Sequence, residues 1–293
     1  FMAFLFFLGL CSCEDVIKLD VQNGVSQLVI DGWLTTKEEE QIIKLTLSQP
    51  YFDNSETIGV SGADVIVFES DSTAHRFIDR GNGEYYLLKE EASFLKTGNQ
   101  YALYVNYQEE EFVSLSKLNR VPKIDSISYE FFSFPFGGTD STESEGYLAE
   151  FYANDPPGEG DTYWIRTTKN GNLVNNPTQI SIAYDAGFSP GSKSDALLFI
   201  QPIRQSINDG FYKHQDSIHV ELWSISPEAF YYLLQVRQES GNGGIFATPP
   251  ANIPTNIFNL NENSTKKAIG FFGLSSVSGF SIVIDSTLAR PKQ

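Results

Sequence analysis

The sequence has little cysteine: its two cysteines, Cys11 and Cys13, both lie within the first thirteen of 293 residues. A bridge between residues two apart is strained, so the rest of the chain has neither a disulfide nor thiol chemistry. Positive charge is also scarce, because 20 Lys and Arg face 37 Asp and Glu, for a formal net charge of -17. Phosphate backbones bind to basic patches, so this composition argues against nucleic acid as a partner.

Long hydrophobic runs and familiar catalytic motifs are missing as well. After Cys13 no stretch reaches the roughly 18 apolar residues that a membrane-spanning helix needs. Gly59-Val60-Ser61-Gly62 lacks the final glycine of the hydrolase nucleophile elbow. The three histidines are not at zinc-ligand spacing; they are His75, His214 and His219. We therefore expect no metal site and no catalytic residue from these motifs.

The beginning of the chain carries the most specific signal. Residues 1–10 are unbroken apolar residues or glycine. Such a run is too short to cross a hydrocarbon layer of about 30 Å, but it suits the apolar region of a secretory signal. With Leu10 three places before it and Ser12 immediately before it, Cys13 resembles the acylated cysteine of a bacterial lipobox.

We therefore predict residues 1–12 as a lipoprotein signal peptide, a covalent lipid on Cys13 and residues 13–25 as a polar leader. Acyl chains bind a membrane with about 0.8 kcal/mol per buried methylene, so several chains would make release negligible. Two alternatives stay open. The apolar run could form a buried strand or helix, or Cys11 could be the acylated residue, although Leu10 would then stand where a small side chain is needed.

Hydrophobic patterns of period two follow this leader. In residues 26–120, alternating segments such as 42–47, 64–68 and 101–107 are separated by turns such as 79–83. Short strands at this spacing predict an antiparallel β-sandwich of the immunoglobulin or transthyretin kind. With 41% hydrophobic residues, the chain has enough apolar surface for packed cores.

Residues 121–293 are predicted as a second antiparallel β domain that carries one α-helix, so the fold class is mainly β. The helix is expected at about residues 227–240. Ser226 is placed as its N-cap, Pro227 as its first residue and Gly241 as its stop. Three side chains share the face that should be buried against the sheet: Phe230, Leu233 and Leu234.

An aromatic cluster early in this second region is the candidate partner contact. It consists of Tyr129, Phe131, Phe132, Phe134 and Phe136. Apolar residues lie on both faces of this short segment, and Pro135 ends any strand there. Exposed aromatic side chains suit protein-protein binding. The alternative is a strand that buries both of its faces between the sheet and the helix.

Two acidic loops are the other candidates. They contain Asp140, Glu143 and Glu145, and Asp155, Glu159 and Asp161. A glycosidase needs two carboxylates at a set distance in space, which proximity in sequence does not establish. Either loop could hold Ca²⁺ through its oxygens, but neither has the spacing of a dedicated calcium loop. We treat both as solvated loops and keep a surface hydrolase as an alternative function.

Several segments together resemble a known family. They are the lipobox at Cys13, Leu28-Val29-Ile30-Asp31-Gly32-Trp33, Tyr51-Phe52, Val60-Ser61-Gly62-Ala63, Asp155-Pro156-Pro157-Gly158, Val220-Glu221-Leu222, Pro249-Pro250-Ala251-Asn252 and Gly270-Phe271-Phe272. Their order and spacing are similar to those of Bacteroidota lipoproteins defined by a domain of unknown function (DUF4249). The resemblance covers nearly the whole mature chain and implies no catalytic residue.

The resemblance also implies a place in the cell. Such lipoproteins are exposed at the surface of the outer membrane and are encoded beside a TonB-dependent receptor with a carboxypeptidase-regulatory-like plug extension. The pair Glu14-Asp15 is similar to their acidic export signal. We therefore expect a non-catalytic accessory subunit of a TonB-dependent transporter, with no cofactor besides the lipid on Cys13. A free-standing adhesin is a further alternative, which neighbouring genes would distinguish because an adhesin needs no adjacent transporter.

Overall fold

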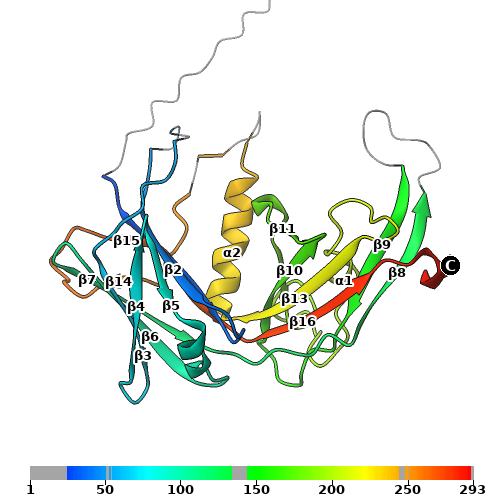
Figure 1. Ribbon diagram of the computed structural model, residues 1–293, viewed down its shortest axis with the longest axis horizontal. Coiled ribbons are helices and arrows are strands. Elements are labelled where there is room, and N and C mark those ends of the chain that lie inside the picture. Colours follow the sequence, from blue (N-terminus) through cyan, green and yellow to red (C-terminus); the bar gives the residue numbers. More distant parts are fainter. Residues whose placement is uncertain are drawn as a thin grey trace, which may run out of the picture.

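The computed structural model describes residues 25–50, 53, 55–133, 144–243, 248–249 and 251–291. The predicted signal peptide, the lipidation residue Cys13 and the acidic pair Glu14 and Asp15 lie outside these residues, as does the predicted leader up to residue 24. Within the described residues the chain forms two β-rich lobes with one long helix between them (Figure 1). The predicted fold class, mainly β with antiparallel sheets, is confirmed.

The first lobe is a nine-stranded sheet in the order β14-β7-β6-β3-β4-β5-β2-β1-β15. Its strands are β1 (Leu28–Thr35), β2 (Gln41–Leu47), β3 (Asp64–Glu69), β4 (Ala74–Gly81), β5 (Glu84–Leu87), β6 (Gln100–Tyr107), β7 (Glu110–Lys117), β14 (Phe258–Asn259) and β15 (Ala268–Ser275). The first half of β4 pairs with β3 and its second half with β5. The sheet therefore turns a corner at β4 and encloses one core, which includes Leu45, Tyr85 and Leu103.

The last strand of this sheet corrects the predicted division of the chain. β15 runs parallel to β1, with Leu28 opposite Ala268, and β14 pairs with β7. The range 121–293, predicted as a separate domain, thus supplies two strands to the first lobe. Parallel partners need a long crossover connection, and this one joins residues about 240 positions apart, so local sequence patterns carry no sign of the pairing.

The second lobe contains a five-stranded sheet and a separate two-stranded sheet. The first has the order β11-β10-β13-β16, with β12 also paired to β10, and the second is β8-β9. These strands are β8 (Ser126–Ser133), β9 (Glu145–Tyr152), β10 (Thr162–Lys169), β11 (Asn172–Val174), β12 (Ser181–Tyr184), β13 (Ser217–Ile225) and β16 (Val277–Val283). Both sheets contribute to one core, where Phe151 lies with Tyr163 and Val220.

Short helical segments complete the described structure. They are α1 (Gln201–Arg204), η1 (Lys89–Phe94), η2 (Pro177–Gln179) and η4 (Ser286–Leu288). The long helix α2 spans Pro227–Ser240, which confirms the prediction. Ser226 caps it by accepting a hydrogen bond from the backbone N–H of Ala229 at 3.2 Å, and Gly241 is its C-cap. Its buried side chains are Ala229, Phe230 and Leu233, whereas Leu234 is only partly buried.

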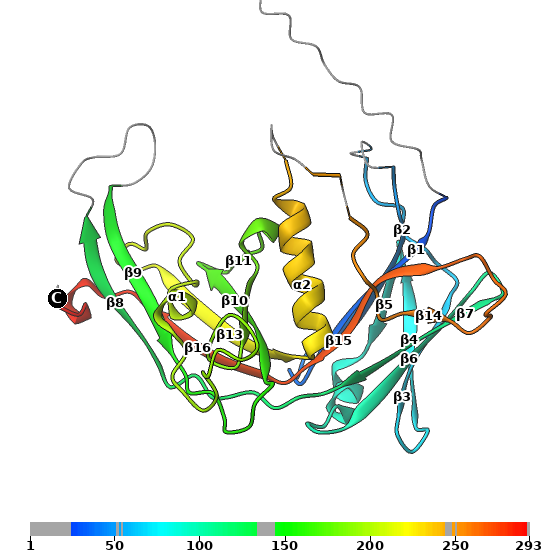
Figure 2. The ribbon, with the colours of Figure 1, turned by 180° about the vertical axis from the view of Figure 1, so that it is seen from behind.

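The helix α2 stands between the two lobes, as the front and back views both show (Figures 1 and 2). A third core joins Phe230 of α2 to Ile225 of β13 and Phe271 of β15. β15 also continues into β16 through Ser276, whose carbonyl accepts a hydrogen bond from the backbone N–H of Ser224 at 2.9 Å. The lobes are therefore held together by covalent continuity and by a shared apolar core.

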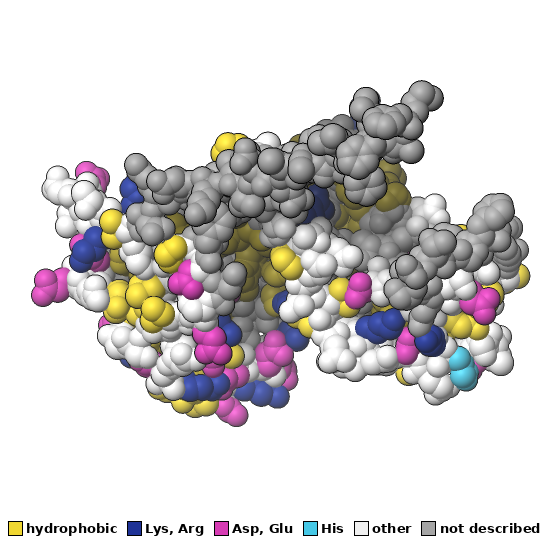
Figure 3. All heavy atoms as spheres, turned by 90° about the horizontal axis from the view of Figure 1, so that it is seen from above, with side chains coloured by type: hydrophobic (Ala, Val, Ile, Leu, Met, Phe, Trp, Pro, Cys, Tyr) yellow, Lys and Arg dark blue, Asp and Glu magenta, His cyan; other side chains and the backbone are white. Residues whose placement is uncertain are grey.

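Charged side chains of both signs are mixed on the surface seen from above (Figure 3). Lys and Arg side chains lie among Asp and Glu side chains on both lobes in that view. On this face the charged side chains are therefore interspersed rather than gathered in one patch of a single sign.

Candidate functional site

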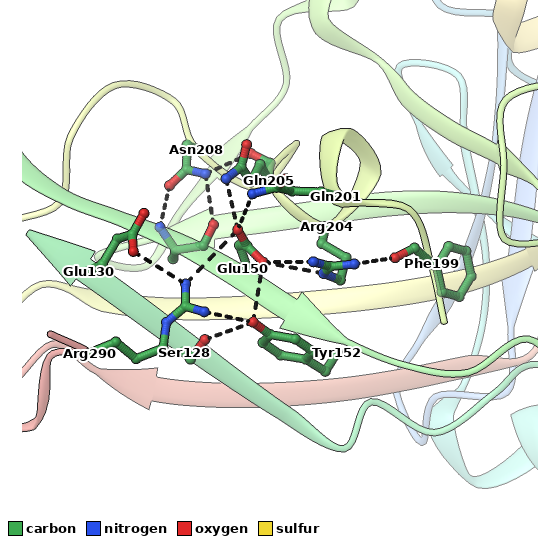
Figure 4. Close-up of polar contacts among 11 residues, drawn as sticks. Ser128, Glu130, Glu150, Tyr152, Phe199, Gln201, Arg204, Gln205, Asn208 and Arg290 are labelled. Atoms are coloured by element: carbon green, nitrogen blue, oxygen red, sulfur yellow. Dashed lines mark hydrogen bonds and ion pairs between the residues drawn. The ribbon is translucent and has the colours of Figure 1, made fainter. Parts of the chain in front are cut away.

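The candidate site is built around Glu150, a carboxylate of β9 that is only 3% exposed. β9 directs this side chain toward α1 and toward Arg290 near the end of the described chain (Figure 4). An ionised carboxylate is costly to bury unless donors surround it. The oxygens of Glu150 accept hydrogen bonds from Gln201 Nε2 (3.1 Å), Gln205 Nε2 (2.8 Å), Arg204 Nη2 (3.1 Å), Arg204 Nε (3.3 Å) and Tyr152 Oη (3.2 Å).

The turn of α1 explains how three donors reach one carboxylate. Positions i, i+3 and i+4 of a helix lie on one face, so Gln201, Arg204 and Gln205 point the same way. Arg204 also donates from Nη1 to the carbonyl of Phe199 at 2.6 Å. The side-chain amide of Asn208 then bonds both the N–H and the C=O of Ala149, each at 2.8 Å. α1 and the segment after it are therefore tied to the backbone and the carboxylate of β9.

Arg290 approaches from the opposite side and is less fully bonded. Its Nη1 donates to Tyr152 Oη at 3.0 Å, while Nη2 lies 3.9 Å from Glu150 and 4.0 Å from Glu130. Its backbone N–H donates to the carbonyl of Tyr129 at 2.8 Å, which fixes the residue beside β8. Its Nε is solvent-excluded and has no hydrogen-bond partner. Arg290 thus keeps donor capacity that the surrounding protein does not use.

These residues line a surface pocket of about 470 Å³. The pocket is lined by Glu130, Phe131, Phe132, Glu150, Tyr152, Gln201, Arg204 and Arg290. Its two carboxylates and two guanidinium groups balance in formal charge, and three aromatic rings supply apolar surface. Five of its eight lining residues are charged or carry a side-chain amide, so the pocket is more polar than a typical small-molecule site.

The pKa of Glu150 suits a binding role better than proton transfer. Burial raises the pKa of Glu150, but hydrogen bonds from Gln201, Gln205 and Arg204, together with the charge of Arg204, outweigh it and hold the pKa below its usual value. Glu150 is therefore ionised at neutral pH and only accepts hydrogen bonds. A general acid needs a pKa raised toward the working pH, so Glu150 is unsuited to that role.

The predicted aromatic contact divides into exposed and buried residues. Phe131 is 45% exposed, and its ring lies edge-on to Tyr147 at 5.5 Å. Phe132 is partly buried and stacks on Phe211 at 6.1 Å. Phe134 and Phe136 lie outside the described residues.

Tyr129 was predicted to belong to the contact surface, but the structure buries it. It is 7% exposed and belongs to the core of the second lobe. Its hydroxyl donates to the carbonyl of Asp285 at 3.0 Å and accepts from the N–H of that residue at 2.9 Å. Alternation along β8 turns Ile127 and Tyr129 inward while Ser128 and Glu130 lie on the other face, so Tyr129 has a structural role.

The described carboxylates of the two acidic loops have separate surroundings and separate partners. Glu145 and Glu159 are exposed, and Asp140 and Glu143 lie outside the described residues. Asp161 forms an ion pair with Arg120 at 2.6 Å. The remaining predicted carboxylate, Asp155, is buried and accepts hydrogen bonds from Tyr163 Oη at 2.6 Å and from the backbone N–H of Ala196 at 3.2 Å. These two carboxylates therefore hold neighbouring loops in place.

His219 has neighbours of the types found in a hydrolytic triad. Its Nδ1 lies 2.7 Å from Ser281 Oγ, and its Nε2 lies 3.3 Å from Glu221 Oε1. Glu221 is, however, already bonded to Lys37 Nζ at 2.9 Å and to Trp223 Nε1 at 2.9 Å. Ser281 also lies in a regular strand rather than at an exposed turn, where a nucleophile meets backbone donors. We assign this group to cross-strand bonding.

The sequence did not single out Glu150, Arg204 or Arg290. Glu150 and Arg204 are 54 positions apart, and hydrogen bonds over such separations leave no periodic pattern. The one local signal is a carboxylate within the apolar segment Leu148-Ala149-Glu150-Phe151-Tyr152. A charged residue in such a segment needs partners from elsewhere in the fold.

Residues 14–280 match the family model described as Domain of unknown function (DUF4249). The chain belongs to this family. The match spans both lobes of the DUF4249 fold, from β1 into β16, and includes Glu150 and Arg204 but ends before Arg290. A comparison with curated proteins found no match.

Two further observations concern the described part of this DUF4249 protein. None of its helices combines the length and apolar character required to cross a bilayer. In the same residues, His, Cys, Asp and Glu side chains do not gather in threes as a metal site would require.

Proposed function

We propose that this chain is a surface-exposed outer-membrane lipoprotein, anchored by lipid on Cys13, that serves as a non-catalytic accessory subunit of a TonB-dependent transporter. The lipobox sequence supports the lipid anchor, and the acidic pair Glu14-Asp15 supports export to the cell surface. No contact among the described residues favours an adhesin or a hydrolase over a docked subunit.

One observation carries the binding role: the pocket beside β8-β9 combines an exposed aromatic ring with charged groups that are balanced within the site. Phe131 offers apolar surface to a partner, and the charged side chains of Glu130 and Arg290 line the pocket beside it. Glu150, in contrast, is fully engaged as an acceptor and fixes the geometry. Interfaces typically gather their binding energy on a few aromatic and arginine side chains of this kind.

The position of β8 and β9 in the molecule also suits a docking surface. β8 and β9 pair only with each other as strands, and they lie at the end of the second lobe away from the first lobe (Figure 1). A partner at this end would leave the contact between the lobes undisturbed. We therefore assign the transporter-facing surface to the exposed part of β8-β9 that includes Phe131 and the rim of the pocket.

Affinity purification of the tagged full chain from detergent-solubilised outer membranes tests this proposal. We expect a TonB-dependent transporter to co-purify with the wild type, and Phe131→Ser to lower its yield at least several-fold. Phe258→Ser is the matched control, because Phe258 is 65% exposed but lies on β14 of the first lobe. Isolation of the wild-type chain without any transporter would reject the docking proposal, and a Cys13→Ser protein still retained in the membrane would reject the anchor.

A further inference from the structure

The three tryptophans of the chain meet where the two lobes join, far from one another in sequence. Trp33 comes from β1, Trp164 from β10 and Trp223 from β13. The ring centroids of Trp33 and Trp164 lie 5.3 Å apart, and those of Trp164 and Trp223 lie 5.8 Å apart. Phe271 of β15 stacks on Trp33 at 5.4 Å. These rings form a continuous aromatic cluster across the two lobes, which we call the tryptophan cluster; Trp33 and Trp164 are half-buried, whereas Trp223 and Phe271 are buried.

Arg166 of β10 lies against this cluster. Its guanidinium carbon is 4.3 Å from the ring centre of Trp223 and 4.8 Å from that of Trp164. Strand pairing explains the arrangement, because Trp164 opposes Trp223 and Arg166 opposes Glu221 one pleat further along β10 and β13. Two indole rings therefore hold the guanidinium in place through cation-π contacts.

Arg166 differs from the other six arginines of the sequence, all of which lie in the described part. Each of those six has a hydrogen bond or ion pair, namely Arg76, Arg80, Arg120, Arg204, Arg237 and Arg290. For Arg166 there is no hydrogen bond or ion pair with any residue that the structure describes, although the side chain is half-buried. Its nitrogens are not among the solvent-excluded unpartnered atoms of these residues, so they keep some contact with solvent.

Two of the nearby carboxylates are already paired with a lysine. Glu221 lies 2.9 Å from Lys37 Nζ, and Glu39 lies 3.2 Å from the same group. Desolvation lowers the pKa of Arg166, and the negative charges of Glu221, Glu39 and Asp31 only partly offset that effect. These carboxylates therefore influence Arg166 through space without binding its N–H groups.

We propose that Arg166, held by Trp164 and Trp223, is the anchor of a site for a ligand that carries a carboxylate. A planar guanidinium presents paired N–H donors whose spacing matches the two oxygens of a carboxylate. The half-buried rings of Trp33 and Trp164 supply apolar surface for the body of the same ligand. A carboxylate with one negative charge fits better than a phosphate dianion, because Asp31 and Glu221 repel the dianion more strongly.

Intrinsic fluorescence of the full chain tests this site, since all three tryptophans lie in it. N-acetyl-phenylalanine is the probe, and its carboxamide, which lacks the charge, is the matched ligand control. The wild type should show a saturable change in emission with the acid and none with the amide. Arg166→Gln should bind the acid at least about tenfold more weakly, as expected for the loss of a charge-assisted hydrogen bond. Inorganic phosphate should bind more weakly than the acid.

Three variants separate recognition from folding. Arg166→Lys keeps the charge but not the planar fork, so it should also lose most of the affinity while unfolding at a temperature close to that of the wild type. Arg80→Gln is the protein control, because Arg80 lies 4.2 Å from the ring centre of Tyr86 but is already paired with Glu40. Trp223→Phe should retain binding of the acid with a smaller emission change.

Several results would overturn the site. They are no saturable response to the acid, equal binding of the acid and the amide, tighter binding of phosphate, or wild-type affinity in Arg166→Lys and Arg166→Gln. Calorimetric titration of the same samples gives a readout that does not depend on the tryptophans. No transporter is needed for these measurements, so their failure would be distinct from failure of the docking proposal.

Discussion

The titration of Asp155 should make the protein less stable as the pH rises through the weakly acidic range. Asp155 is 2% exposed, and burial raises its pKa from 3.8 to about 6 against the opposing hydrogen bonds from Tyr163 and Ala196. The negative charges of nearby Asp161 and Asp185 contribute to this increase in the pKa. The folded state therefore holds the Asp155 proton more tightly than the unfolded state does.

The size of the effect follows from the difference in pKa. Its stabilising contribution is fully present below about pH 3.8 and is lost as the pH rises through about 6. A difference of about two pKa units, at 1.36 kcal/mol per unit, amounts to roughly 3 kcal/mol. Asp155→Asn cannot ionise, and its amide can still bond Tyr163 and Ala196, so the variant should lack this pH-dependent loss.

Urea unfolding of both proteins between pH 4 and 7 measures the effect directly. The free energy of unfolding of the wild type, minus that of Asp155→Asn, should fall by about 2 to 2.5 kcal/mol over this range, because part of the loss has already occurred at pH 4. Asp209→Asn, the same substitution at an exposed position, serves as the control for the chemical change itself. A difference for Asp155→Asn that stays constant with pH would refute the reasoning, since Asp155 would then titrate alike in the folded and unfolded states.

Three other predictions concern the helix, the candidate site and Ser281. In urea unfolding, Phe230→Ala should cost about 3 to 5 kcal/mol and Leu234→Ala less than about 2 kcal/mol, because Phe230 is buried and Leu234 only partly so; equal costs would contradict the assigned packing. Glu150→Ala should cost about 3 to 5 kcal/mol by leaving Arg204 without its carboxylate, and a loss below 1 kcal/mol would speak against it. In mass spectrometry after treatment with a fluorophosphonate, Ser281 should be no more modified than Ser217 of β13, and selective labelling would indicate a nucleophile.

The parts of the fold that local chemistry determines could be predicted from the sequence. The ends of α2 follow from the hydroxyl of Ser226, the fixed φ of Pro227 and the conformational freedom of Gly241, all of which act within one helical turn. Alternation of apolar residues likewise indicated the strands of the first lobe. Leu234 was predicted to be buried, but the period of the helix gives only a direction, and the depth of burial depends on what packs there.

Features that depend on distant partners could not be predicted. The pairing of β15 with β1 and the bonds from Arg204 and Arg290 to Glu150 join segments without any shared local pattern. Tyr129 shows the same limit at a single residue. Its sequence position suggested an exposed aromatic contact, but the carbonyl and N–H of Asp285 give its hydroxyl a buried set of partners. Tyrosine is readily buried where its hydroxyl finds such partners.

Photo-crosslinking in intact cells tests the central proposal most directly. A benzophenone amino acid is placed at Phe131 of the full chain, and at Phe258 on the opposite lobe as the control. The account predicts a covalent adduct between position 131 and an outer-membrane TonB-dependent transporter, with little or none from position 258. An adduct with a transporter from position 258 alone, or none from position 131, would contradict it.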